Sequence, residues 1–207
     1  MKVLELFCGT KSIGKVFKAA GHEVFSVDLD PMHEPDLIAN ILKLDLAKLP
    51  WIPDVIWASP PCTTFSVASM GKHWGGGKGA YIPKTLECLT GLKLMAKTKG
   101  MILKLKPKLW FIENPRGVMR KVIGLDKYLH TVTYCQYGDK RMKPTDIWTN
   151  SKMWKPRPMC KNGSSCHEAA PRGAKTGTQG LKGAIERGVI PVQLCQEILK
   201  QCELEIG

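Results

Sequence analysis

The sequence predicts an α/β protein in which a mainly parallel sheet carries helices on both faces. Short apolar segments alternate with segments of helical periodicity along residues 2–149, a pattern typical of consecutive βαβ units. Residues suited to ligand binding or catalysis follow several of the apolar segments: Cys8, Gly9, Asp28, Asp45, Cys62 and Glu113. Because the carboxyl ends of parallel strands meet at one edge of a sheet, we expect one cleft to collect these residues.

The first half of the chain predicts a strand, a helix and then further strands. Apolar segments indicate strands at residues 2–7, 23–27 and 55–58, and a short strand or turn at residues 37–42. The apolar residues of segment 12–20 share one helix face, and Gly21 is expected to end that helix.

The second half continues the alternation. Residues 84–105 have helical spacing, although Gly91 and Gly100 weaken this helix. Further strands are expected at residues 109–112, near residues 129–135 and at residues 145–149. The segment 185–204 returns to a helical pattern, which is clearest in the residues after Pro191.

Composition divides the 207 residues into three parts. Residues 1–150 carry the α/β pattern and suit a single domain. Residues 151–182 are poor in apolar residues and rich in Gly, Ser, Lys and Pro, so we expect a small, irregular, basic lobe. Residues 183–207 are expected to form a helical segment that packs back on the first part.

The positive charge is concentrated in the middle of the chain. The formal net charge is +13, and residues 71–175 hold 22 basic but only 6 acidic side chains. This concentration indicates a polyanionic partner such as nucleic acid, because Lys and Arg neutralise phosphates. A solvated, lysine-rich surface is the alternative explanation.

The composition also argues against membrane and secreted classes. No apolar run approaches the ~18 residues of a membrane span, and the N-terminus lacks the features of a signal peptide. Eight Cys in 207 residues are too sparse for a disulfide scaffold. We therefore expect reduced thiols, a cytoplasmic location and no membrane partner.

The turn after the first strand suits an anionic or nucleoside ligand. Gly9 permits a tight turn, and the following helix start presents unpaired N–H groups. Asp28, at the end of the next strand, has the position of an acid that binds ribose hydroxyls. An ordinary strand-to-helix turn without a ligand is the alternative.

Cys62 follows two prolines at the end of an apolar segment. The prolines fix the backbone and place the thiol rigidly, as a nucleophile requires. A mobile, basic, Gly-rich loop is expected between Cys62 and Lys84, with Trp74 available to contact a base. A buried structural cysteine before a disordered loop is the alternative.

Glu113 follows another apolar segment directly. A carboxyl group with a raised pKa in a cleft could donate a proton to a ring nitrogen near neutral pH. Helix capping or a salt bridge would also explain a glutamate there.

Three residues of the lobe are potential zinc ligands: Cys160, Cys166 and His167. Five residues separate the two cysteines, which is loose for a zinc site, and a fourth ligand is not evident, though Cys135 could be recruited. The sequence favours free thiols in a polar loop, and no metal is expected.

Taken together, the motifs resemble the DNA (cytosine-5)-methyltransferase family, and the compact form is most similar to phage-encoded members. The resemblance is carried in order by Phe7-Cys8-Gly9, Pro60-Pro61-Cys62, Glu113-Asn114-Pro115, residues 137–149 and residues 187–191. It implies a Rossmann-like fold that binds S-adenosylmethionine, and DNA as the substrate.

The resemblance also implies roles for individual residues. Cys62 would attack C6 of a flipped-out cytosine, and Glu113 would contact N3 and the exocyclic amine. The cofactor would be bound by Phe7, Cys8, Gly9, Thr10, Asp28, Leu29, Asp45, Leu46, Pro60 and Val189. The substrate would be bound by Ser66, Lys72, Trp74, Asn114, Arg116 and Lys143.

The chain departs from the family pattern in two places. The family usually has Gln and two Arg at alternate positions where this chain has Arg141, Lys143 and Thr145, so Arg141 is the expected substitute for the catalytic arginine. The usual long recognition domain is reduced to the short lobe. Two other functions stay open: a tRNA cytosine-5 methyltransferase, and a catalytically idle nucleic-acid-binding protein.

Overall fold

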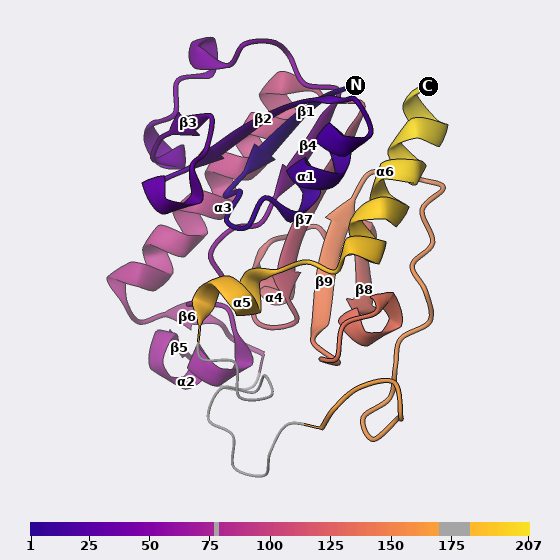
Figure 1. The fold of residues 1–207 in the computed structure, drawn as a ribbon. Coiled ribbons are helices and arrows are strands. Elements are labelled where there is room, and N and C mark those ends of the chain that lie inside the picture. The colour runs from indigo at the N-terminus through magenta and orange to yellow at the C-terminus, as the bar shows by residue number, and fades with distance from the viewer. Residues whose placement is uncertain (77–78, 170–182) are drawn as a thin grey trace.

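The computed structural model describes residues 1–76, 79–169 and 183–207. Its described part contains a seven-stranded sheet (Figure 1). In sheet order the strands are β3 (Leu37–Ile38), β2 (Glu23–Asp28), β1 (Lys2–Leu6), β4 (Val55–Ala58), β7 (Leu109–Pro115), β9 (Pro144–Thr149) and β8 (Leu129–Thr133). The first five run parallel, whereas β9 is antiparallel to both of its neighbours. The predicted mainly parallel α/β fold is confirmed.

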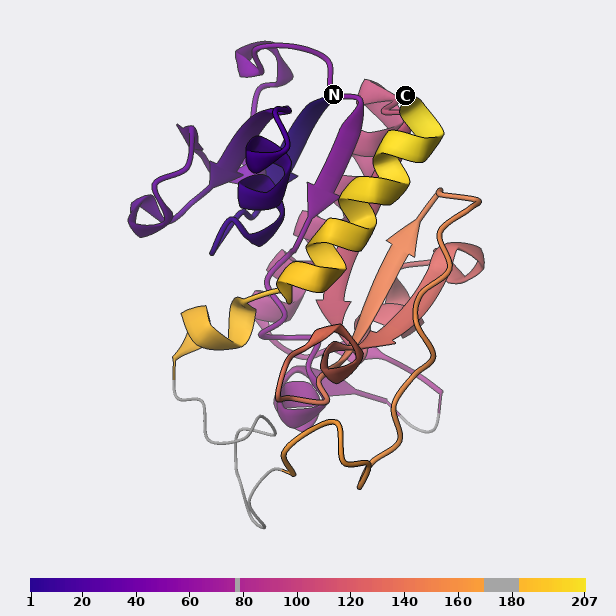
Figure 2. The same cartoon turned by 45° about the vertical axis from the view of Figure 1, so that its right-hand side comes forward.

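Helices cover both faces of the sheet. α1 (Ser12–Ala19) and α6 (Val192–Ile206) lie on one face and α3 (Leu86–Leu105) on the other (Figures 1 and 2). Three shorter helices are α2 (Met70–His73), α4 (Met119–Val122) and α5 (Ala184–Gly188).

The sheet has an apolar core on each face, and alternate side chains of each strand point into one core or the other. In β4, Val55 and Trp57 face the core that holds α1 and α6, whereas Ile56 and Ala58 face the core of α3. Successive strand side chains point to opposite faces, so a sheet covered on both sides needs continuous apolar strands. This is why the strands read as unbroken apolar runs in the sequence.

The region between Cys62 and α3 differs from the expected loop. It contains α2 and a small hairpin in which β5 (Trp74–Gly75) pairs with β6 (Ile82–Pro83). Trp74 lies in the core, where its Nε1 donates to the carbonyl of Thr64 at 2.6 Å. Residues 77–78 of the predicted Gly-rich loop lie outside the described residues.

The lobe has no helix or strand in its described part, residues 151–169. Its remaining residues, 170–182, lie outside the described part of the chain. None of the described helices has both the length and the hydrophobicity of a membrane span.

Candidate active site

The strand registers align the predicted functional residues at one edge of the sheet. Leu6 of β1 pairs with Ala58 of β4, and Ala58 pairs with Ile112 of β7. The residues that follow on all three strands, among them Glu113, therefore lie along the carboxyl edge, as the sequence predicted.

The loop that carries Cys62 is held by β7. Asn114 is fully buried, and its Nδ2 donates to the carbonyl of Pro60 at 2.8 Å. The carbonyl of Cys62 accepts from the backbone N–H groups of Phe65 and Ser66, both at 3.0 Å, so Cys62 opens a tight turn. Asn114 therefore positions the cysteine loop through this buried hydrogen bond.

Glu113 is buried in a polar niche beside that loop. Tyr134 Oη donates to Glu113 Oε1 at 3.2 Å, and the Ser59 side chain also hydrogen-bonds the carboxyl group. Burial raises the pKa of Glu113, and the nearby charge of Lys143 opposes this shift. The raised pKa favours the neutral acid, which can donate a proton.

Lys143 supplies a cation between these groups. Its Nζ donates to the carbonyl of Arg187 at 2.7 Å and lies 4.5 Å from the centre of the Tyr134 ring. Burial lowers the pKa of Lys143, while the charges of Glu113 and Cys62 raise it. The charges of Cys62, Glu113 and Lys143 therefore influence one another's pKa values.

The pKa of the Cys62 thiol reflects the same neighbours. Burial raises it, the charge of Glu113 raises it further, and the charge of Lys143 lowers it. A neutral Glu113 removes one of the two obstacles to forming the thiolate, which is the reactive species.

Arg141 occupies a different position from the one expected of a base-contacting arginine. Its guanidinium forms a salt bridge with Asp139, and Nε lies 2.9 Å from Asp139 Oδ1. Nη1 and Nη2 donate to the carbonyls of Glu186 at 3.2 Å and Val189 at 3.4 Å. The protein itself therefore occupies these donors, and Lys143 is the cation whose charge acts on both Cys62 and Glu113.

The turn after β1 has an unusual backbone. Phe7, Gly9 and Lys11 have φ values of 55°, 47° and 54°, in the left-handed region. The Gly9 N–H donates to Asp28 Oδ2 at 3.0 Å, which links the ends of β1 and β2. Asp28 Oδ1 accepts from the N–H of Asp30 at 3.0 Å, so the half-buried carboxylate is held in place.

The C-terminal segment packs against this turn. Ser12 Oγ, at the start of α1, accepts from the backbone N–H of Ile190 at 3.2 Å and lies 2.7 Å from Thr10 Oγ1. This contact joins residues that are 178 positions apart in the sequence, and it brings Val189, the neighbour of Ile190, beside the turn. The C-terminal segment therefore lies against the turn after β1.

The residues of the turn fit a nucleoside cofactor. Asp28 offers carboxylate oxygens suited to ribose hydroxyls. Leu29 and Val189 are apolar yet 64% and 39% exposed, which leaves surfaces suited to the face of a purine. Cys8 is buried, and burial raises its pKa to about 12, so its thiol stays neutral.

A buried carboxyl group fixes the helix that follows the turn. The N-cap residue of α1, Lys11, forms no side-chain cap, but Glu5 Oε2 of β1 accepts from the Gly14 N–H at 3.2 Å. Burial raises the pKa of Glu5 to about 7. The sequence did not indicate this contact, since Glu5 occurs within an apolar strand.

Asp45 and Leu46 lie further from the sheet edge than the sequence indicated. β3 ends at Ile38, Ala39 N–H donates to the carbonyl of Asp28 at 2.8 Å, and Asn40 follows. Asn40 is therefore the first polar side chain after β3, whereas Asp45 caps a later turn and is exposed. Asn40 Oδ1 accepts from the backbone N–H of Leu42 at 2.9 Å, so Asn40 caps the turn that follows β3.

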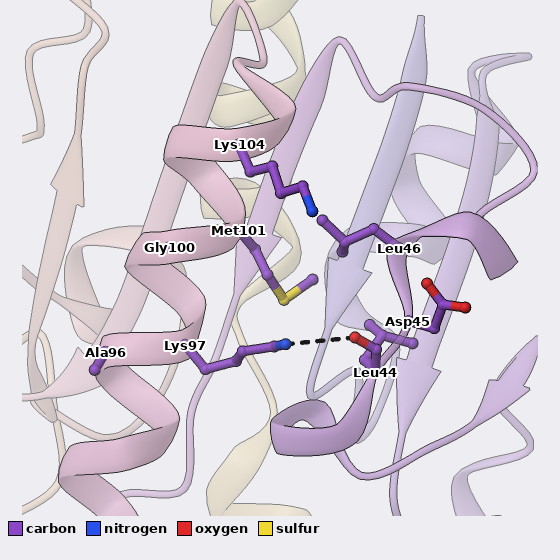
Figure 3. Close-up of a pocket in the computed structure, with 8 residues that line it drawn as sticks. All are labelled: Leu44, Asp45, Leu46, Ala96, Lys97, Gly100, Met101 and Lys104. Carbon is purple, nitrogen blue, oxygen red and sulfur yellow. Dashed lines mark hydrogen bonds between the residues drawn. The ribbon is translucent and has the colours of Figure 1, made fainter.

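A cavity of about 400 Å³ lies between residues 44–46 and the second half of α3. Its lining residues are Leu44, Asp45, Leu46, Ala96, Lys97, Gly100, Met101 and Lys104. Figure 3 shows Lys97 reaching the carbonyl of Leu44, at 3.4 Å, while the Asp45 carboxylate points away from α3. The turn after β1 does not line this cavity, whereas Asp45 and Leu46, two of the residues expected to bind the cofactor, do.

The remaining predicted substrate residues differ in exposure. Lys72 and Arg116 are exposed, as phosphate-binding side chains would be. Ser66 is half-buried, and its Oγ lies 2.8 Å from Ser69 Oγ. Trp74 is only 5% exposed, because it packs against Phe65 in the core, so its ring is not presented to a base.

The fold and the site together indicate a class of enzyme: a Rossmann-like α/β protein with a turn suited to a nucleoside and, at the same sheet edge, a cysteine beside a buried carboxyl group. Residues 1–133 match the family model described as C-5 cytosine-specific DNA methylase. The chain belongs to this family, which comprises S-adenosylmethionine-dependent DNA cytosine-5 methyltransferases.

Individual relatives agree with this assignment. The chain is 31% identical to a protein of Frog virus 3 (isolate Goorha) described as a probable DNA (cytosine-5)-methyltransferase, over 98% of this chain and 100% of the relative. It is 22% identical to the type II methyltransferase M.AgeI of Thalassovita gelatinovora, over 67% of this chain but only 36% of that protein. The match therefore extends over the whole viral relative but over only about a third of M.AgeI.

Solved structures show the same fold. The Entamoeba histolytica methyltransferase EhMeth superposes with a TM-score of 0.50 at 14% identity. The match covers 78% of this chain and 57% of that structure, so the chain spans little more than half its length.

Proposed function

We propose that the protein methylates C5 of cytosine in DNA, with Cys62 as the nucleophile and Glu113 as the proton donor. The observation that carries this proposal is the 2.8 Å hydrogen bond from Asn114, the neighbour of Glu113 on β7, to the carbonyl of Pro60, which holds the Cys62 loop beside the buried carboxyl group at the carboxyl edge of the sheet. Cytosine C5 is a poor nucleophile until a thiolate adds at C6, so the reaction needs these groups together.

Each residue has a defined part in the reaction. A sulfur lone pair of the Cys62 thiolate forms the bond to C6, while neutral Glu113 donates its proton to N3. The electron pair this leaves at C5 takes the methyl group that bound S-adenosylmethionine supplies. Loss of the C5 proton to water then restores the C5–C6 double bond and expels the thiolate, and Glu113 recovers its proton from N3.

Lys143 balances charge during these steps. Its ammonium group favours the Cys62 thiolate before addition, and it then stabilises the Glu113 carboxylate after the proton has moved to N3. Lys143 therefore takes the role that the sequence assigned to Arg141.

DNA fits the charge of the molecule. The basic residues of the middle region, including exposed Lys72 and Arg116, are suited to phosphate contacts. A cytosine within a duplex is out of reach of Cys62, so it must be extruded from the stack. By its short length and basic composition, the lobe of residues 151–182 takes the place of the family's recognition domain in this proposal.

A duplex that carries 5-fluorocytosine tests the nucleophile directly. Fluorine at C5 cannot leave as the proton does, so the methylated adduct stays attached to Cys62. Incubation with S-adenosylmethionine is expected to give a covalent protein–DNA band that survives denaturation. Cys62→Ala should abolish this band, whereas Cys88→Ala, which removes a buried thiol outside the site, should retain it.

Methyl transfer from tritiated S-adenosylmethionine identifies the polymer. Label is expected in DNA and not in tRNA. Label in tRNA alone would assign the chain to RNA, and absence of label in both would indicate an idle binding protein. A covalent band that persists in Cys62→Ala would disprove the assignment of the nucleophile.

A further inference from the structure

Four potential metal ligands meet where the lobe touches the end of β8. They are Cys135, Cys160, Cys166 and His167, and all four ligand atoms lie within 4.8 Å of one another. Cys135 belongs to the 3₁₀ helix Tyr134–Tyr137 that follows β8, whereas the other three belong to the lobe. The spacing of the three lobe residues is loose for a zinc site, and Cys135 was only a possible fourth ligand in the sequence; the fold places it beside the other three.

The distances suit a tetrahedral ion. Zinc–sulfur bonds of about 2.3 Å and zinc–nitrogen bonds of about 2.0–2.1 Å place tetrahedral ligand atoms roughly 3.6–3.8 Å apart. The Cys166 sulfur lies 3.7 Å from both Cys135 Sγ and His167 Nδ1. The Cys160 sulfur lies 3.1 Å from Cys166 Sγ and 3.4 Å from His167 Nδ1, so small shifts would complete the geometry.

The local backbone is shaped to bring these atoms together. Gly163 has a φ of 86°, and the Ser164 N–H donates to the carbonyl of Lys161 at 3.2 Å, which turns the chain back on itself. The N–H of Cys160 donates to Thr133 Oγ1 of β8 at 2.9 Å. After His167, the N–H of Glu168 donates to the carbonyl of Lys140 at 2.9 Å.

The start of the lobe is anchored to the domain, because Trp154 packs in the core and Arg157 forms an ion pair with Glu197. The following segment, which carries Cys166, has little support of this kind. Residues 161–166 are all exposed, and the described part of the lobe contains no helix or strand. A small segment without its own apolar core commonly depends on a metal or a disulfide. A Cys160–Cys166 disulfide would account for two of the four side chains but would not explain why Cys135 and His167 lie beside them.

We infer that Cys135, Cys160, Cys166 and His167 bind one structural Zn²⁺ ion. Three thiolates and one imidazole fill a closed tetrahedral site, which leaves no position for a substrate. The ion would fasten the lobe to residues next to Tyr134, which hydrogen-bonds Glu113. This inference goes beyond the proposed function, because it concerns a site that the methyl-transfer reaction does not use.

Metal analysis of the purified full chain tests the inference. Inductively coupled plasma mass spectrometry is expected to find one zinc per chain, and Cys160→Ser should lower this to below about a tenth. Cys202→Ser is the matched control, because this buried thiol of α6 lies outside the cluster and zinc should be retained. Zinc content is independent of activity, so its result stands whether or not the chain methylates DNA.

Cobalt exchange of the wild-type protein gives a second readout if Cys160→Ser fails to fold. Co²⁺ is expected to produce sulfur-to-cobalt charge-transfer absorption and the strong visible bands of a tetrahedral site. A chain that is purified without chelator, contains no zinc, and keeps the same melting temperature with and without added zinc would overturn the inference. A Cys160–Cys166 disulfide found by mass spectrometry of the native protein would also overturn it.

Discussion

At the scale of single residues, the reactivity of Cys62 depends on the protonation states of Glu113 and Lys143. The negative charge of Glu113 raises the pKa of the thiol and the positive charge of Lys143 lowers it. Because burial raises the pKa of Glu113, its neutral form coexists with the Lys143 cation over a wider pH range. The cysteine is then exposed to the favourable charge alone.

Replacing Lys143 by Met should therefore slow methyl transfer. We expect kcat to fall by about 10²-fold, the usual effect of removing one preorganised electrostatic contact. Without the cation the pKa of Cys62 rises further, so the acidic limb of the pH–rate profile should move to higher pH. Initial rates with tritiated S-adenosylmethionine between pH 6 and 9 would measure both effects.

Lys200→Met is the control for this variant, because Lys200 is an exposed residue of α6. Its pH–rate profile should match that of the wild type. A Lys143→Met protein with an unchanged profile would show that its charge does not act on the thiol during turnover.

At the scale of elements, α1 is attached to β1 by the contact between Gly14 and Glu5. The Gly14 N–H donates to the Glu5 carboxyl group, and a Cβ added at Gly14 would overlap that group and lie 3.3 Å from Val24 Cγ1. The helix begins at Ser12, directly after the turn that fits the cofactor. The spacing between α1 and the sheet therefore sets the shape of that turn.

Gly14→Ala is expected to lower the free energy of unfolding by about 1–3 kcal/mol, since the added methyl group overpacks a filled site. It should also weaken S-adenosylmethionine binding, because Glu5 and α1 must move apart. Urea unfolding and isothermal titration calorimetry would measure the two effects.

Gly100→Ala provides the opposite expectation. A Cβ at Gly100, in the interior of α3, meets no atom within 4 Å, so the substitution should stabilise the protein by about 0.5–1 kcal/mol. Equal effects at the two glycines would contradict the steric argument at Gly14.

At the scale of the whole molecule, the uneven charge determines how the protein meets its substrate. The basic middle of the chain supplies the strands and loops beside the site, whereas residues 1–70 hold more acidic than basic side chains. A field of this kind attracts phosphates before any base is recognised.

DNA binding should consequently weaken steeply with salt. If about 6–10 phosphates are neutralised, affinity should fall by roughly 10³–10⁵ between about 50 and 200 mM salt. Arg116→Ala should reduce the slope of log K against log salt by about 1, whereas Lys200→Ala should leave it unchanged. Fluorescence anisotropy with a labelled duplex would give these slopes, and an unaltered slope for Arg116→Ala would remove this residue from the phosphate contacts.

The sequence by itself determined the order of the main strands and helices along the chain, the mainly parallel sheet and the occurrence of Cys62 and Glu113 at the ends of apolar segments. It did not predict the β5–β6 hairpin, the short helices α2 and α4, or the separation of α5 from α6. These features follow from local patterns, because an apolar run or a helical period is visible in neighbouring residues. The motifs that follow the strands were placed at one edge for the same reason, since parallel strands align their carboxyl ends.

Only the tertiary structure decided which residues are partners. It buried Trp74 and joined Arg141 to Asp139 and to the carbonyl groups of residues 186–189. It also held Lys143 Nζ between the carbonyl of Arg187 and the ring of Tyr134, near enough for its charge to act on Cys62 and Glu113. It also brought Cys135 to three lobe residues that are at least 25 positions away in the chain. Such contacts depend on long-range packing and on the competition among donors for buried acceptors, which no local pattern records.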